Sequence, residues 1–238
     1  MLFWIIISVI IVSLLSLIGI FFLMLKEKLL NKILLALVAL ASGALLGSAF
    51  FHLIPEAMEL KIETAALLIV VGILVFFVFE KVLHWRHCHK GKCPVHSFSY
   101  SVLLGDSLHN FVDGLIIAAA YLSNVGLGIT TTLAIVLHEI PQEIGDFGVL
   151  LYSGFTKKKA LLYNFLSALT ALIGALIGYF VSANFNHIFL LPFAAGGFIY
   201  VAVSDLIPEI FKKSKMLEFL IHLLFIVIGL AIMWLLAL

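Results

Sequence analysis

Eight long apolar segments account for most of the sequence, and they constrain the fold more than any motif does. They cover roughly residues 2–25, 31–57, 63–84, 98–122, 125–152, 159–182, 186–209 and 216–237. A transmembrane helix needs about 20 consecutive apolar residues, whereas the strands of a membrane barrel are about ten residues long and alternate in polarity. We therefore predict an all-α integral membrane protein with eight transmembrane helices.

The composition agrees with this prediction. Hydrophobic residues make up 64% of the 238 residues and charged residues only 11%, against about 25% charged residues in soluble domains. The lipid bilayer is therefore the expected environment. A net charge of +1 gives no basis for a nucleic-acid partner. Because no linker or composition shift divides the chain, we expect a single transmembrane domain over residues 1–238.

The positions of the basic residues predict the orientation. Thirteen of the fourteen Lys and Arg residues fall in the loops after the first, third, fifth and seventh apolar segments, and only Lys61 falls on the other side. Cytoplasmic loops carry an excess of Lys and Arg, so these four loops are predicted to face the cytoplasm. Both termini would then be non-cytoplasmic, and the plasma membrane is the expected location.

Two distant segments resemble one another. Residues 41–56 read ASGALLGSAFFHLIPE, and residues 194–209 read AAGGFIYVAVSDLIPE. The second predicted helix runs outward and the seventh runs inward, so the two LIPE sequences would lie at opposite faces of the membrane. Inverted repeats of this kind occur in transporters, where they surround a site near the middle of the bilayer. Two similar helix ends are the simpler interpretation.

The longest polar loop, about residues 84–97, is rich in metal-binding side chains. It falls on the predicted cytoplasmic side and contains both cysteines of the chain. Imidazole and thiolate groups bind borderline and soft metals, so the loop is a separate metal-site candidate; a basic loop with incidental histidines is the alternative. The candidate ligands are His84, His87, Cys88, His89, Cys93 and His96.

Polar residues interrupt the fourth and fifth apolar segments at matching depths. The fourth segment carries four of them on one helical face: Asp106, His109, Asn110 and Asp113. The fifth carries another stripe: His138, Glu139, Gln142, Glu143 and Asp146. Ionisable residues inside a membrane are costly and mark ion or proton pathways. A cation held between the two faces would offset their charge.

The side-chain types indicate which cation this would be. Mg²⁺ and Ca²⁺ take mainly oxygen ligands, whereas two imidazoles with carboxylates suit Zn²⁺ and related first-row ions. The nearby carboxylates of Asp113, Glu139 and Glu143 could neutralise two divalent ions if one of them bridges. Pro141 removes a backbone hydrogen bond and is expected to bend the fifth helix, which frees the Leu137 carbonyl toward the site.

Three other interpretations fit parts of the pattern. The polar residues could only hydrogen-bond between helices, or they could relay protons, as chains of His, Asp and Glu do in pumps. The pair His138 and Glu139 also resembles the start of the H-E-x-x-H motif of zinc proteases. In this chain, however, residue 142 is Gln and Pro141 interrupts the helix. We therefore do not expect an enzyme.

The two polar stretches resemble the motifs of the ZIP (Zrt/Irt-like protein) family of metal transporters. The branch that the chain resembles most has HNFxDG in its fourth helix and HExPHExGD in its fifth. Here residues 109–114 read HNFVDG and residues 138–146 read HEIPQEIGD. The resemblance extends to residues 52–56, 163–170 and 196–209.

This resemblance implies a fold, a function and a set of ligands. The fold would have eight helices in a 3+2+3 arrangement, with inverted repeats of helices 1–3 and 6–8 around helices 4 and 5, and dimers are reported for it. The function would be transport of Zn²⁺, or of Fe²⁺, Mn²⁺ or Cd²⁺, into the cytoplasm, with the metal as substrate and no catalytic cofactor. The implied ligands of a binuclear centre are His109, Asn110, Asp113, His138, Glu139 and Gln142, with Ser167 nearby; Glu143 is a further candidate.

The chain departs from the family pattern at residue 142. The branch has His there and other branches have Glu, whereas Gln offers only a neutral oxygen and cannot bridge two cations as a carboxylate can. Ser167 stands where some members carry Glu. A metal ion would enter past the outer residues His52 and Glu56. It would leave past four acids on the cytoplasmic side: Asp106, Asp146, Asp205 and Glu209.

Overall fold

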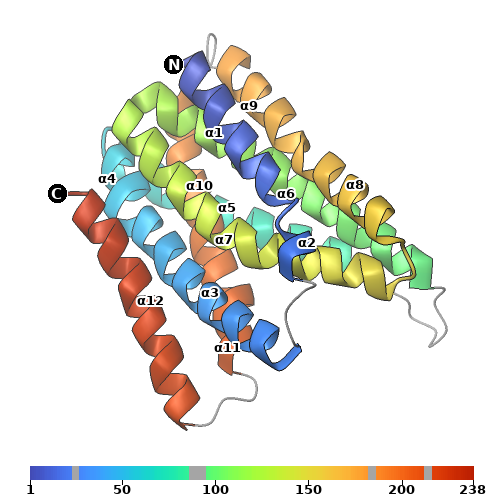
Figure 1. The fold of residues 1–238 in the computed structure, drawn as a ribbon. Coiled ribbons are helices and arrows are strands. Elements are labelled where there is room, and N and C mark those ends of the chain that lie inside the picture. The colour runs from blue at the N-terminus through green and yellow to red at the C-terminus, as the bar shows by residue number, and fades with distance from the viewer. Residues whose placement is uncertain (23–26, 86–94, 182–185, 212–215) are drawn as a thin grey trace.

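The computed structural model describes residues 1–22, 27–85, 95–181, 186–211 and 216–238 (Figure 1). Every regular element in these ranges is a helix, and the elements follow one another as eight helical segments close to the predicted bounds. The segments are α1 Leu2–Leu15 with α2 Gly19–Phe22; α3 Glu27–Ser48 with η1 Ala49–Leu53 and α4 Ile54–Ala57; α5 Ile62–Trp85; α6 Val95–Ser123; α7 Val125–Tyr152; α8 Lys157–Ala168 with α9 Thr170–Val181; η2 His187–Phe189 with α10 Leu190–Tyr200, η3 Val201–Leu206 and α11 Ile207–Phe211; and α12 Met216–Leu236.

The helices have the length and composition of membrane spans. Within the described ranges, five are long and apolar enough to cross a bilayer: Ile33–Ala57, Val102–Ser123, Lys157–Val181, His187–Ser204 and Met216–Leu236. α1 and the segment Ile62–Val78 are shorter apolar helices, and the polar residues in the middle of α7 lower its mean hydropathy. Large apolar side chains face outward on α5 and α12. These features are those of an all-α membrane protein.

The first apolar segment is broken, although the sequence predicts one helix over residues 2–25. α1 ends at Leu15, and the amides of Leu17 and Ile18 bond to carbonyls three residues back, which tightens the last turn. The Ser16 hydroxyl donates to the Ser13 carbonyl at 2.8 Å. A serine hydroxyl that bonds to a nearby carbonyl in this way competes with helical hydrogen bonding.

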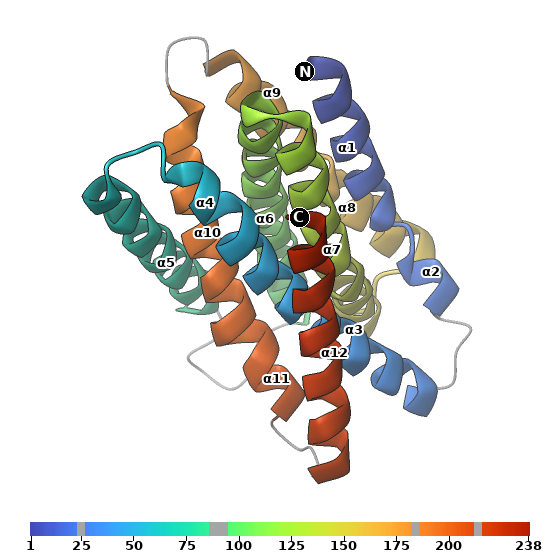
Figure 2. The same ribbon diagram turned by 90° about the vertical axis from the view of Figure 1, so that its left-hand side faces the viewer.

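The two segments with similar sequences also share their local structure. Each contains a π-helical stretch, η1 or η3, that ends at the Leu of the LIPE sequence. Gly43 and Gly196, at equivalent positions, each touch the backbone of another helix: a Cβ on Gly43 would lie 2.0 Å from the Ile226 carbonyl oxygen, and one on Gly196 would lie 2.1 Å from that of Ile69. The ends of the two segments, α4 and α11, lie at opposite ends of the bundle (Figure 2). These observations support an inverted repeat.

The helices pack as two groups. α1, α6, α7, α8 and α9 pack on one another, and α3 packs on α12 while α5 packs on α10. α3 also packs against α7 and joins the groups. The two predicted repeats are therefore interleaved, because α3 and α5 of the first repeat have their main partners in α12 and α10 of the second. The large apolar core runs through both groups.

Candidate metal centre

A one-residue connection sets the depth of the polar residues in α6 and α7. Asn124 lies between the two helices and caps α7, since its Oδ1 accepts a hydrogen bond from the backbone amide of Leu127 at 2.8 Å. The helices fold back on each other and pack side by side (Figure 1). Residues at equal distance from Asn124 therefore meet, and this brings the middle of α6 to the middle of α7.

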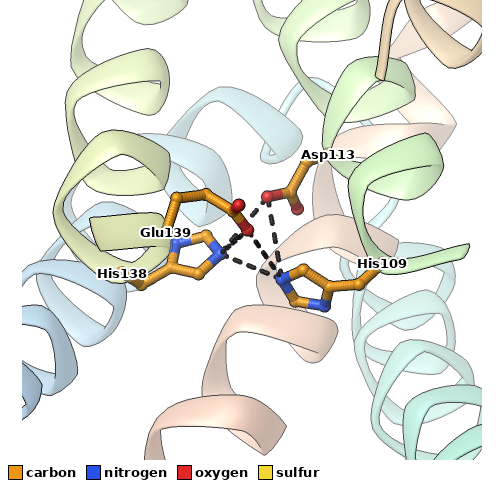
Figure 3. Close-up of side chains that lie close together, drawn as sticks. All are labelled: His109, Asp113, His138 and Glu139. Carbon is orange, nitrogen blue, oxygen red and sulfur yellow. Dashed lines mark hydrogen bonds and ion pairs between the residues drawn. The ribbon is translucent and has the colours of Figure 1, made fainter. Parts of the chain in front are cut away.

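Four of the predicted ligands converge on one point (Figure 3). His138 Nε2 lies 3.1 Å from His109 Nε2 and 3.2 Å from Asp113 Oδ2. Glu139 Oε1 lies 3.4 Å from His109 Nε2 and 3.5 Å from His138 Nε2. Each side chain offers a ligand atom within 4.8 Å of the others. Two nitrogens and two carboxylate oxygens at this spacing form a donor set that suits a first-row divalent ion.

The centre is buried and its carboxylates lack hydrogen-bond partners. Asp113, His138 and Glu139 are at most 2% exposed. Asp113 Oδ2 and both Glu139 oxygens have no hydrogen-bond partner among the described residues. His138 Nδ1 lies 3.2 Å from the Ala134 carbonyl oxygen. A carbonyl oxygen only accepts, so Nδ1 carries the proton and Nε2 presents a lone pair to the centre, as in metal-ligating histidines.

A second group of carboxylates adjoins the first. Ligand atoms of Asp106, Glu139 and Glu143 lie within 4.8 Å of one another, so Glu139 belongs to both groups. Asp106 is 4% exposed and Glu143 is fully buried. The sequence predicts that Asp106 shares a helical face with His109 and assigns it to the exit path rather than to the ligands.

Amide groups hold these carboxylates. Asn110 Nδ2 donates to Asp106 Oδ1 at 2.8 Å, and Gln142 Nε2 donates to the same oxygen at 3.4 Å. Asn164 on α8, which the sequence pattern does not single out, donates from Nδ2 to Glu143 Oε2 at 2.5 Å. The only indication of this role in the sequence is that Asn164 lies in the segment 163–170, which is part of the resemblance. Ser167 is buried, and its hydroxyl donates within its own helix.

The remaining predicted path residues lie outside the two groups of ligand atoms. His52 bonds through Nε2 to the Met233 carbonyl at 2.9 Å and through Nδ1 to the Thr130 hydroxyl at 3.4 Å. Glu56 accepts from Asn124 Nδ2 at 3.2 Å. Asp146 is partly buried on α7. The predictions for the loop (His84, His87, Cys88, His89, Cys93, His96) and for the side chains of Asp205 and Glu209 lie outside what the structure describes.

A partly open cavity reaches the centre from one side. Its volume is about 230 Å³, and its lining residues are Val38, His109, Pro141, Gln142, Val201 and Leu206. These residues lie on the side of the centre away from α4 and Asn124. Toward α4, the buried side chains of Leu45, Ile117 and Phe198 belong to the packed apolar core. The centre is therefore accessible from the end of the bundle that carries α11.

A comparison of the whole sequence with models of protein families agrees with the motifs and with the mixed nitrogen and oxygen centre. The family model described as "ZIP Zinc transporter" matches residues 1–97 and 86–237. The chain belongs to the ZIP family. This confirms the family predicted from the motifs, and the apolar helices confirm a multi-pass membrane protein.

Named ZIP relatives share different lengths of this chain. Human zinc transporter ZIP10 is 46% identical over 128 residues, which are 51% of this chain and 15% of ZIP10. Zinc transporter ZIP13 of Pongo abelii is 32% identical over 217 residues (83% of this chain, 65% of that protein). Zinc transporter zipt-7.1 of Caenorhabditis briggsae is 28% identical over 276 residues (85% and 70%). The relatives are named as transporters, in agreement with the prediction that the chain is not an enzyme.

Proposed function

We propose that this ZIP protein moves a divalent transition-metal ion, zinc above all, across a membrane into the cytoplasm. The observation that carries the proposal is the buried group of His109, Asp113, His138 and Glu139 beside a partly open cavity. Buried carboxylates without partners are costly unless a cation offsets them. The zinc transporter names of the relatives support the same function.

The donor set favours zinc over harder ions. Imidazole nitrogen and carboxylate oxygen are ordinary zinc ligands, and Fe²⁺, Mn²⁺ and Cd²⁺ are the alternative substrates. The predicted ligands Asn110, Gln142, Glu143 and Ser167 lie around this group, and we propose Asn110 and Gln142 as supports for the carboxylates. The metal is the transported substrate rather than a resident cofactor.

The direction of transport rests on the predicted orientation. With eight crossings in a 3+2+3 arrangement, the basic residues Lys157–Lys159 and the cavity would both face the cytoplasm. The ion would then leave the centre past Asp106 and Asp146. We place the protein in the plasma membrane with both termini non-cytoplasmic.

We expect access from the outer side to require a rearrangement, because the cavity described above reaches the centre from the side of α11. The packing favours a movement of the group formed by α1 and α6–α9 relative to the group formed by α3, α5, α10 and α12. A movement of one predicted repeat against α6 and α7 alone fits this packing less well, because α3 and α5 pack on α12 and α10. The metal ligands on α6 and α7 would travel with the first group.

Uptake of radioactive zinc into proteoliposomes tests the function. We expect His109→Ala and Asp113→Ala to lower zinc uptake to the background of empty vesicles. His187→Ala, at a histidine far from the centre in η2, is the matched control and should transport as the parent does. Uptake that survives both ligand changes would refute the metal-centre proposal.

A proton pathway is the second candidate, since buried His, Asp and Glu also serve proton relays. The close contacts among His109, Asp113, His138 and Glu139 are compatible with either role. The same vesicles separate the two functions. Dissipation of a pH gradient without added metal would favour the proton pathway, and zinc uptake without such dissipation would favour metal transport.

A further inference from the structure

The cavity beside the metal centre has apolar walls and a small polar part. His109 and Gln142 supply the polar groups, and the other described lining residues are apolar: Val38, Pro141, Val201 and Leu206. Apolar walls with a few placed polar groups are typical of a small-molecule site. The volume of about 230 Å³ is below the roughly 300–1,000 Å³ of sites for drug-sized ligands. The cavity therefore suits a smaller molecule.

His109 connects this cavity to the centre. Its side chain is 16% exposed, whereas those of Asp113, His138 and Glu139 are at most 2% exposed. Its Nε2 faces the centre, and its other ring nitrogen points away from it (Figure 3). The Ala134 carbonyl holds His138 from behind, but no described residue gives His109 Nδ1 such an acceptor. His109 is therefore the group of the centre that is easiest to displace.

The four donor atoms leave no vacant position on a tetrahedral ion. Their separations that involve a histidine nitrogen are 3.1–3.8 Å. With zinc–ligand bonds of about 2.0–2.2 Å, the corners of a tetrahedron lie about 3.3–3.6 Å apart. A further ligand must then displace one of the four. Entry from the cavity would break the bond from the ion to His109 Nε2 and form one to the incoming donor, with no transfer of electrons.

The charge around the centre favours a neutral donor. Asp113 and Glu139 belong to the centre, and Asp106 and Glu143 form the adjoining group with Glu139. These carboxylates disfavour an anionic thiolate or carboxylate ligand, and the apolar walls add the cost of burying its charge. Neutral imidazole binds zinc and related first-row ions and brings no charge into the cavity.

We propose that the cavity binds a small neutral nitrogen heterocycle of the imidazole class. This ligand takes the place of His109 on the ion and promotes release of the ion toward the end of the bundle that carries α11. The inference rests on the proposed function, because the ion at the centre is the transported substrate.

Metal dissociation from the purified full chain tests the proposal. The protein is loaded with Co²⁺, whose visible absorption reports its ligands, and is mixed with excess EDTA at about pH 8, above the pKa of about 6.5 of an imidazole side chain. We expect imidazole to raise the rate of Co²⁺ loss at least about tenfold, because loss of one supporting group weakens metal binding about 10–100-fold. Acetate at the same concentration should leave the rate unchanged.

Two valines of η3 form a matched pair of variants. Val201 lines the cavity, whereas Val203 is 49% exposed. Val201→Phe should fill the cavity and abolish the imidazole effect, and Val203→Phe should behave as the parent does. Neither change removes a metal ligand, so both variants should keep the Co²⁺ absorption recorded without imidazole. If Val201→Phe does not fold, Val38→Phe fills the same cavity from α3.

The outcomes separate the ligand site from the transport function. No imidazole effect in the parent, or an equal effect in the cavity variant and in Val203→Phe, would overturn the site. An equal effect of acetate would overturn the selection of a neutral donor. Zinc uptake without imidazole tests transport independently. Absent uptake with the imidazole effect intact would refute transport alone, and normal uptake without the imidazole effect would refute the ligand site alone.

Discussion

The imidazoles of His109 and His138 face each other through the same ring atom, with their Nε2 nitrogens 3.1 Å apart. The Ala134 carbonyl keeps the proton of His138 on Nδ1, so its Nε2 carries a lone pair. The two Nε2 nitrogens attract one another only with a cation or a proton between them. The unpartnered oxygens of Asp113 and Glu139 lie at the same point, which favours a divalent cation.

Zinc should therefore stabilise the folded protein. We expect added zinc to raise the Tm of the purified protein and a chelator to lower it, because a ligand present at 100 times its Kd adds about 2.7 kcal/mol to the free energy of unfolding. Thermal unfolding followed by tryptophan fluorescence measures the shift. The variant His109→Ala with His138→Ala is the control, and a zinc-dependent shift of equal size in that variant would contradict the prediction.

The glycines of the two motif stretches, Gly114 and Gly145, should respond differently to substitution. A Cβ on Gly114 would lie 1.9 Å from the Ala171 carbonyl oxygen, whereas one on Gly145 would have nothing within 4 Å. Gly114→Ala must separate α6 from α9, at a cost of about 1–3 kcal/mol, and it should displace the adjacent Asp113. Gly145→Ala should be neutral or stabilising, since Ala favours a helix over Gly by about 1 kcal/mol.

The two variants serve as controls for each other. Tm and zinc uptake measured on both should fall for Gly114→Ala and stay at parent values for Gly145→Ala. Equal tolerance at the two positions would show that α6 and α9 do not pack as closely as described.

The sequence predicts much of this architecture because helical segments and their polar faces depend on local periodicity. The stripes that contain His109 and His138 could be placed at equal depth from the segment bounds alone. The break at Ser16 and the position of Asp106 beside Glu143 depend on contacts between helices. The same is true of the amide orientations: whether Gln142 turns its nitrogen or its oxygen toward Asp106 depends on tertiary neighbours, which the spacing does not give.

The sequence likewise does not give the contacts of His52. Its location suggests a ligand on the ion path, whereas its contacts suggest a structural role. Both ring nitrogens are engaged, by the Met233 carbonyl and the Thr130 hydroxyl. We expect His52→Ala to lower the free energy of unfolding by about 1–3 kcal/mol, since it removes buried hydrogen bonds, and to leave the KM for zinc unchanged. His52→Gln should recover part of the stability. A raised KM in both variants with an unchanged Tm would instead assign His52 to the path.

The one-sided cavity predicts which residues of α3 a water-soluble reagent can reach. Val38 lines the cavity, whereas Leu45, two turns further along α3, is fully buried in the apolar core. In a background with Cys88→Ser and Cys93→Ser, we expect Val38→Cys to react with a membrane-impermeant thiol reagent and Leu45→Cys to stay unmodified. Both positions lie on about the same face of one helix, so exposure to the cavity is the main difference between them.

The side from which the reagent is applied tests the orientation as well. If the loops rich in lysine face the cytoplasm, Val38→Cys should react in inside-out vesicles and not in right-side-out vesicles. Zinc should slow the reaction, because His109 lines the same cavity as Val38 and an ion bound there would obstruct it. Labelling of Val38→Cys in right-side-out vesicles and not in inside-out vesicles would mean that the cavity faces outward and that the proposed direction of release is reversed.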